Sequence, residues 1–179
     1  MGILVAATLP TRRDRPPRLE LECFDAVNSL PDSLYPPVWP LMQFGALAAV
    51  PATAGVIWLT GDRARAARLL AAGTATWALA KGVKRVIRRG RPASVEPNVH
   101  VRGQAQTGDG FVSGHAAVSV ALASGVIRSV PVLDPVLAVW AAAVGLSRMY
   151  VGAHLPLDVL GGAALGLIVD AAIELAFPI

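Results

Sequence analysis

Cysteine and charged residues are both scarce in this chain. Cys23 is the single cysteine among 179 residues, which excludes an intrachain disulfide and a metal cage built from cysteines. Charged residues make up only 16% of the sequence, hydrophobic residues make up 54%, and the mean hydropathy is +0.55. This apolar excess is too great for an ordinary soluble domain and indicates a membrane protein with several spans.

Aromatic residues are also few, at 6% of the chain, and they do not alternate with the basic residues. The formal net charge is +4, and arginine supplies fourteen of the sixteen basic residues. Basic residues beside apolar spans usually meet lipid headgroups, so we expect membrane lipids and not nucleic acid as partners. The apolar stretch 2–9 is short and lacks a basic start, so we predict no cleavable signal peptide.

The apolar runs predict an all-α, polytopic membrane bundle of about five transmembrane helices. The first run, 41–60, has no charge and is expected to kink at Pro51. The other spans are expected at about 64–86, 113–127, 135–150 and 156–177. Residues 1–40 are interpreted as a tail and an interfacial helix, and 41–179 as one membrane-embedded domain. Gly162 and Gly166 in the last run would let two helices approach closely.

Three polar stretches interrupt the apolar pattern, and all three fall on one side of the predicted membrane. Burying such groups costs free energy unless they pair with each other or with a ligand. Lysine and arginine bind phosphate oxygens, and a histidine can attack or protonate a phosphate. The set therefore predicts a phosphate site. The stretches are Lys84 with Arg91-Pro92, Ser113-Gly114-His115, and Ser147-Arg148 with His154 and Asp158.

Each stretch taken alone also has a structural explanation. Ser113 to His115 opens a helix, where unpaired amides bind anions, but a capping serine beside a buried histidine would give the same sequence. His154 and Asp158 are four residues apart and share a helix face, as a catalytic pair or as a structural one. The remaining cations of the basic run suit a cuff that faces lipid headgroups. They are Lys81, Arg85, Arg88 and Arg89.

Taken together, the pattern resembles the three signature motifs of the type 2 phosphatidic acid phosphatase superfamily. This family includes polyprenyl-pyrophosphate phosphatases of bacteria and the soluble vanadium haloperoxidases. The spacings match in all three blocks, and one departure is visible, because Val112 stands where the family usually has proline. The matching blocks read Lys84-x6-Arg91-Pro92, then Ser113-Gly114-His115, then Ser147-Arg148-x5-His154-x3-Asp158.

The resemblance implies a metal-independent phosphatase without a cofactor. It implies that His154 attacks phosphorus to form a phosphohistidine, that Asp158 orients His154, and that His115 protonates the leaving oxygen and then activates water. The phosphoryl oxygens would be held by the remaining motif residues. These are Lys84, Arg91, Arg148, Ser113 and the Gly114 amide. No acidic cluster beside the motifs offers a magnesium site.

The expected substrate is a lipid phosphate, of the polyprenyl phosphate or pyrophosphate type or the phosphatidate type. Phosphatidylglycerol phosphate is an alternative, and so is a non-catalytic protein that binds or transports lipid phosphates. A haloperoxidase agrees poorly with five apolar spans. The resemblance places the site on the outer face of the cytoplasmic membrane, whereas the distribution of arginines favours the cytoplasmic face. Assembly into a homo-oligomer is left open.

Overall fold

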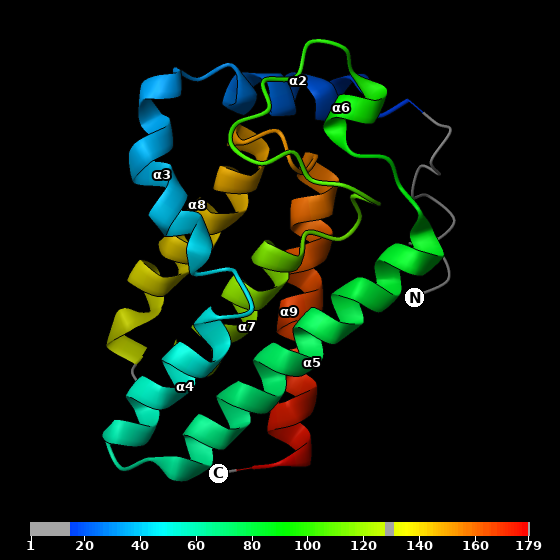
Figure 1. Cartoon of the computed structure of the whole chain (residues 1–179). Coiled ribbons are helices and arrows are strands. Elements are labelled where there is room, and N and C mark those ends of the chain that lie inside the picture. Colours follow the sequence, from blue (N-terminus) through cyan, green and yellow to red (C-terminus); the bar gives the residue numbers. More distant parts are fainter. Residues whose placement is uncertain (1–14, 128–130, 179) are drawn as a thin grey trace.

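The computed structural model describes residues 15–127 and 131–178, and within these ranges it contains helices and no strand. Five long or medium helices form a bundle, and shorter helices cover one of its ends (Figure 1). The elements are α2 (Arg18–Asn28), η1 (Asp32–Leu34), α3 (Tyr35–Gln43), α4 (Ala49–Leu59), α5 (Arg63–Ile87), α6 (Pro92–Val95), α7 (Gly114–Ile127), η2 (Pro131–Leu133), α8 (Asp134–Tyr150) and α9 (Pro156–Ala176).

Helix α7 forms the centre of the bundle and contacts α5, α8 and α9. Helix α2 and the short α6 lie across one end, which we call the capped end (Figure 1). The α4–α5 connection and the last turn of α9 mark the opposite end, which we call the far end. The predicted helices at 64–86, 113–127, 135–150 and 156–177 are confirmed as α5, α7, α8 and α9.

Two glycines allow the closest helix contact in the bundle, that between α7 and α9. A side chain at Gly162 would collide with the backbone oxygen of Ser113, and one at Gly166 with that of Ala117. The small-residue interpretation of this pair is therefore confirmed, because only glycine leaves room for the two backbones. The contact brings the start of α9 against the start of α7.

The first predicted span is wrong in its continuity, because it consists of two helices, α3 and α4, with a break at 44–48. Pro51 causes no kink, since it lies in the first turn of α4, where its missing N–H has no intrahelical partner to lose. In the break, a Cβ at Gly45 would lie 2.6 Å from the carbonyl oxygen of His115. Glycine therefore lets the chain pass directly over the first turn of α7.

The N-terminal segment contains a helix as predicted, α2, which lies across the capped end of the bundle. Its buried residues, Glu20, Phe24 and Asn28, are spaced by four and so share one face. Asn28 Nδ2 donates to the backbone oxygens of Met149 at 3.2 Å and Tyr150 at 2.9 Å. These bonds fasten α2 to the end of α8.

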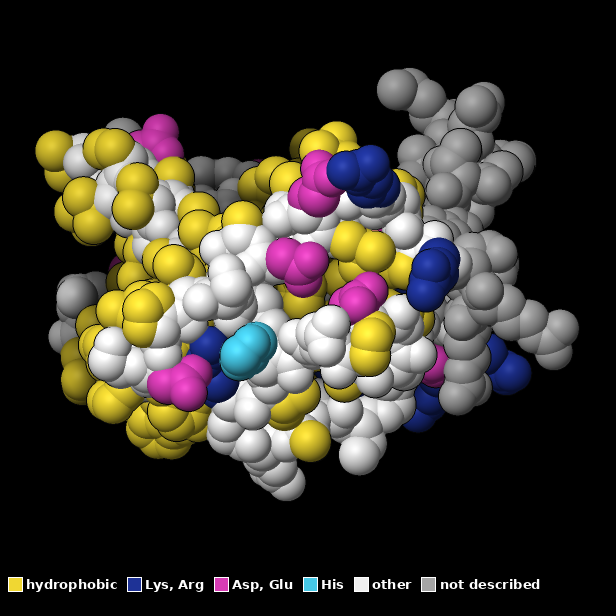
Figure 2. Space-filling model, turned by 90° about the horizontal axis from the view of Figure 1, so that it is seen from above, with side chains coloured by type: hydrophobic (Ala, Val, Ile, Leu, Met, Phe, Trp, Pro, Cys, Tyr) yellow, Lys and Arg dark blue, Asp and Glu magenta, His cyan; other side chains and the backbone are white. Residues whose placement is uncertain are grey.

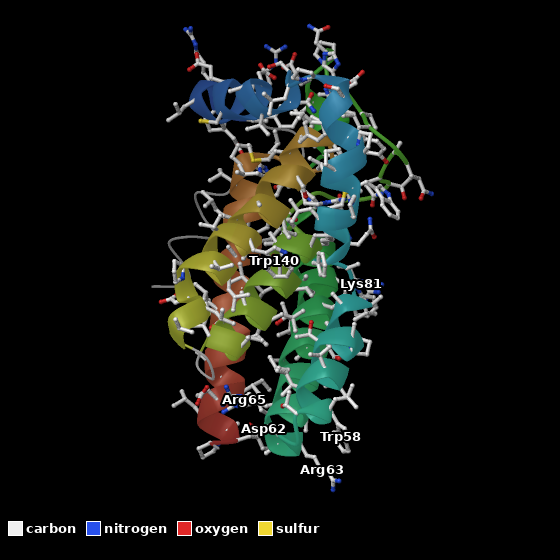
Figure 3. The ribbon with its side chains drawn as sticks, turned by 90° about the vertical axis from the view of Figure 1, so that its left-hand side faces the viewer. Trp58, Asp62, Arg63, Arg65, Lys81 and Trp140 are labelled. Carbon is white, nitrogen blue, oxygen red and sulfur yellow. The ribbon has the colours of Figure 1, made fainter. Side chains whose placement is uncertain are left out.

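Among the described helices, α9 is long and apolar enough to cross a membrane, while α4 and α7 are shorter apolar helices. The capped end shows scattered charged side chains of both signs when seen from above (Figure 2). At the far end, Figure 3 shows Trp58, Asp62, Arg63 and Arg65 close together. There Arg65 Nη1 lies 2.6 Å from Asp62 Oδ2, and the Arg63 guanidinium lies 5.4 Å from the Trp58 ring centroid.

Candidate active site

A cavity of about 190 Å³ lies at the capped end and is lined by residues of all three sequence motifs. Six of the eight predicted site residues line it. They are Lys84, Arg91, Gly114, His115, Arg148 and His154. The other two lie outside this lining, and both are fully buried. These are Ser113, whose N–H donates to the Asp158 carbonyl oxygen at 2.8 Å, and Asp158 itself.

Lys84 and Arg91 hold the loop that covers the cavity. Lys84 Nζ donates to the backbone oxygens of Asp109 at 3.1 Å and Gly110 at 2.8 Å. Arg91 Nε donates to the Thr107 and Gly108 carbonyl oxygens, and Arg91 Nη1 donates to that of Ala153 at 2.8 Å. An ammonium has three donors and a guanidinium has five, so both cations keep donors for a ligand.

Arg148 is buried with few partners among the described residues. Its exposed fraction is 4%, its Nη1 lies 3.1 Å from the sulfur of Met42, and its Nε has no hydrogen-bond partner. A thioether is a weak acceptor, and a buried charged donor without a partner is costly. The cavity therefore suits an anion that would accept from this guanidinium.

Helix α7 begins at the floor of the same cavity. The first backbone bond of its opening turn runs from Ala117 N to Ser113 O at 3.0 Å, so the amides of Gly114 and His115 precede the helical ladder. The Ser113 hydroxyl caps this turn by accepting from Ala116 N at 3.4 Å. A Cβ at Gly114 would meet nothing within 4 Å, so the space above this helix start is open.

His154 lies on the loop between α8 and α9, and its side chain is 4% exposed. Its Nδ1 faces Asp158 Oδ2 at 3.5 Å, which is within ion-pair range but too long for a good hydrogen bond. Burial lowers the pKa of His154 to about 4, although the neighbouring Asp158 acts in the opposite direction. The imidazole is therefore neutral at neutral pH, as a nucleophile must be.

Asp158 is the third residue of α9, and both of its oxygens have partners. Oδ2 accepts from Leu155 N at 2.9 Å, which caps the helix. Oδ1 accepts from Arg89 Nη1 at 2.7 Å. Arg89 and the Leu155 amide thus fix the carboxylate from two sides, independently of its contact with His154.

The prediction that Arg89 faces lipid headgroups is wrong. Its side chain is 3% exposed and pairs with both Asp158 and Glu20. Helix α5 ends at Ile87, because Arg88 has a left-handed backbone with φ of 34°. That single turn points Arg89 inward, whereas Arg85 and Arg88 remain exposed as expected.

Several residues of the site have no signature in the sequence motifs. Glu20 comes from α2, and the break between α3 and α4 contributes Gly45, Ala46 and Leu47 to the cavity wall. The wall also contains Trp77 and Lys81, with Lys81 Nζ 3.7 Å from the Trp77 ring centroid. The spacing of Glu20, Phe24 and Asn28 on one helix face was the signal that could have identified Glu20 as buried.

A second cavity of about 270 Å³ adjoins the first and shares Gln106, His115 and Arg148 with it. Its wall includes Tyr35 and Trp39 of α3 and the loop residue Gln104. His115 therefore lines both the cation-lined cavity and the neighbouring one. No group of three histidine, cysteine, aspartate or glutamate side chains that could hold a metal ion occurs in the described ranges.

A helical bundle with cations and histidines around one small cavity defines a candidate phosphate-handling protein. Residues 65–177 match the family model of the PAP2 superfamily, and the chain belongs to that family. This confirms the resemblance inferred from the motifs. The matched segment contains all eight predicted site residues.

Two solved structures share the fold. Aquifex aeolicus LpxE superimposes with a TM-score of 0.81 at 22% identity, covering 92% of this chain and 98% of that one. The first transmembrane PAP2 type phosphatidylglycerolphosphate phosphatase from Bacillus subtilis gives a TM-score of 0.65 at 24% identity, covering 96% and 90%. A search of curated proteins found no match.

Proposed function

We propose that this protein is an integral-membrane lipid phosphatase that acts through a phosphohistidine. The observation that carries the proposal is the convergence of the three cations of the sequence motifs and two histidines on one cavity of about 190 Å³. Lys84, Arg91 and Arg148 match the three non-bridging oxygens of a phosphoryl group, and charge on these oxygens changes during transfer.

The proposed reaction has two steps. His154 Nε2 attacks phosphorus while the bond to the lipid oxygen breaks. His115, which the negative charge of the bound phosphate protonates, gives its proton to that oxygen. His115 then takes a proton from water, whose oxygen attacks phosphorus and breaks the bond to His154, which releases inorganic phosphate. The contact of Nδ1 with Asp158 leaves Nε2 for the attack. The Gly114 amide completes the proposed oxyanion contacts, and Ser113, behind the cavity lining, would add its hydroxyl hydrogen.

The substrate class follows from the surroundings of the cavity. Its wall includes Leu47 and Trp77, and the flanks of the bundle expose large apolar side chains such as Leu160 and Ile168. We propose that the helices cross the membrane several times, so that a lipid tail lies along them while its phosphate enters the cavity. The candidates are a polyprenyl phosphate or pyrophosphate, phosphatidate, and phosphatidylglycerol phosphate.

The test is phosphate release from these lipids by the purified protein in detergent, with and without EDTA. We expect turnover that EDTA leaves unchanged and that orthovanadate inhibits. A ³²P-labelled lipid, quenched in alkali, should label the wild-type chain but not His154→Asn. Loss of activity in EDTA that magnesium restores, or equal labelling of both proteins, would contradict the mechanism.

Orientation needs a separate measurement. We propose that the cavity faces the outer side of the cytoplasmic membrane. Ala105 is exposed in the covering loop, so Ala105→Cys in a Cys23→Ser background gives one reactive thiol. Labelling of intact cells by a membrane-impermeant maleimide supports this orientation, and labelling only after lysis contradicts it.

A further inference from the structure

Three charged side chains form a buried chain directly behind the proposed nucleophile. They come from three separate parts of the sequence: Glu20 from α2, Arg89 from the end of α5 and Asp158 from α9. Their exposed fractions are 6%, 3% and 0%. Arg89 Nη2 lies 2.5 Å from Glu20 Oε2, and Arg89 Nη1 lies 2.7 Å from Asp158 Oδ1. Burying charged side chains costs desolvation free energy, so we looked for a role of this cluster beyond packing.

We propose that Arg89 and Glu20 are positioning residues that fix Asp158 and set the charge it presents to His154. This inference rests on the proposed function, since it assigns the charge balance of the same reaction. Glu20 lies outside the segment 65–177 that matches the family, so the family resemblance assigns it no role.

The geometry fixes the Asp158 carboxylate in one orientation. Arg89 holds Oδ1, the Leu155 amide holds Oδ2, and only Oδ2 faces His154 Nδ1. Glu20 in turn has both oxygens occupied, one by Arg89 and the other by Leu157 N at 3.0 Å. The charged cluster therefore contacts the first turn of α9 at two points, Asp158 and Leu157 N. Through these contacts α2 is coupled to Asp158, the residue proposed to orient the nucleophile.

The charge balance explains why both partners are present. When His154 Nε2 is phosphorylated with Nδ1 protonated, the ring carries a positive charge. Asp158 and Arg89 alone sum to zero, and Glu20 restores a net charge of −1 beside that ring. Without Arg89, two buried carboxylates would repel each other, and one would take up a proton.

The surroundings of Arg89 keep it charged. Burial alone would lower the pKa of Arg89, but the hydrogen bond to Glu20 and the charge of Asp158 raise it above its usual value. The alternative is that the chain only clamps α2 onto the bundle. Asn28 already provides such a clamp through four hydrogen bonds without touching Asp158, so the two roles are separable.

The test uses full-length protein in detergent and four variants. Glu20→Gln changes the formal net charge of the Glu20–Arg89–Asp158 cluster from −1 to 0. Arg89→Gln changes it to −2 before one of the two carboxylates takes up a proton. The double variant Glu20→Gln/Arg89→Gln returns the net charge to −1, and its two amides can keep a neutral hydrogen-bonded chain to Asp158. Glu22→Gln is the matched control, because Glu22 is exposed on the same helix and pairs with Arg18.

We expect each single variant to lower kcat about 10–100-fold with little change in KM, since the nucleophile is misplaced while the cations are intact. The double variant should recover about tenfold over either single variant. Glu22→Gln should match the wild type. A Glu20→Gln protein with wild-type kcat, or a double variant as slow as the product of the two single effects, would overturn the proposal. Failure of Glu20→Gln to fold without rescue in the double variant would also overturn it, by showing a purely structural role.

A binding measurement keeps this inference distinct from the proposed function. Orthovanadate takes a fifth ligand and reports the placement of His154, whereas inorganic phosphate stays tetrahedral and reports only the cations. Calorimetry should show that Glu20→Gln weakens orthovanadate binding about tenfold and phosphate binding less than twofold. Equal weakening of both ligands would overturn the inference. A wild-type protein that binds orthovanadate but hydrolyses no lipid would instead overturn the proposed function.

Discussion

The two ends of the bundle both contain charged side chains, but they pair these charges differently. At the far end three described cations have a nearby partner. Arg65 pairs with Asp62, and Arg63 lies against the Trp58 ring (Figure 3). Arg68 pairs with Glu174 at 2.7 Å. At the capped end the cavity cations contact backbone oxygens or a thioether instead. Arg148 Nε has no hydrogen-bond partner among the described residues.

This difference separates charges that pair with each other within the fold from charges that we propose bind a ligand. A cation paired with a carboxylate has its charge neutralised within the protein. Three cations that converge on a cavity with no direct ion pair to a carboxylate leave an excess of positive charge, which an anionic substrate can neutralise. Arg89 is the exception that sharpens the comparison, since it lies at the capped end but has two acidic partners and no access to the cavity.

The largest effect is expected at His154. His154→Ala removes the proposed nucleophile and should reduce phosphate release by at least about 10³-fold. Arg65→Ala at the far end is the control and should leave turnover within twofold of the wild type. A His154→Ala protein with a tenth of wild-type turnover would contradict the assignment.

His115→Ala should come next. Loss of the proposed general acid should cost about 10²–10⁴-fold on an alkyl phosphate. The loss should be much smaller on an aryl phosphate, whose leaving oxygen needs no proton. Steady-state kinetics on the two substrates check this, and equal losses on both would mean that His115 serves the site in another way.

Arg91 and Arg85 allow a direct comparison between a cavity cation and a surface cation of the same basic run. Arg91→Ala should cost about 2–4 kcal/mol of transition-state stabilisation, and Arg91→Lys should also be poor, because an ammonium lacks the planar fork. Arg85 is exposed, so Arg85→Ala should change turnover by a few-fold at most, with an effect that fades as salt rises. Equal losses in kcat/KM at the two positions would remove the distinction between cavity and surface cations.

The smallest effect on turnover is expected at Arg68, where stability should change instead. Its side chain is 4% exposed and Glu174 is 34% exposed, so solvent screens part of the interaction. Arg68→Met should lower the free energy of unfolding by about 1–3 kcal/mol while leaving kcat unchanged. Thermal denaturation in detergent and kinetics on the same sample check both halves. A loss of kcat with normal stability would mean that the far end takes part in the reaction.

The sequence predicted the helices of the catalytic segment well, because long apolar runs bounded by Gly, Pro and charges are strong signals. The prediction of one continuous helix failed at 44–48, because this segment contains no charge that would indicate a break. The break is explained by the close contact of Gly45 with His115. Motif spacing brought the histidines, Asp158 and the cavity cations to one side of the predicted membrane, and in the structure the two histidines and the three cations line a single cavity.

The inward turn of Arg89 and the contribution of Glu20 could not be read from the sequence. The left-handed backbone of Arg88 decides which arginine of the basic run faces the protein interior. Arginine rarely adopts this conformation, so the sequence does not predict it. Glu20 and Arg89 are 69 residues apart in the sequence, and they meet only because α2 lies over the bundle. Local patterns carry no information about such contacts.

The approach of Gly45 to His115 has a consequence for the tolerance of this position to change. Any Cβ at residue 45 would lie 2.6 Å from a backbone oxygen and 2.8 Å from a methyl group of Val144, and neither neighbour can rotate out of the way as a long side chain could. Saturation mutagenesis at residue 45 under selection for activity should therefore return glycine alone. Such a result would show that the backbone spacing above α7 restricts the sequence as strictly as the proposed catalytic side chains do.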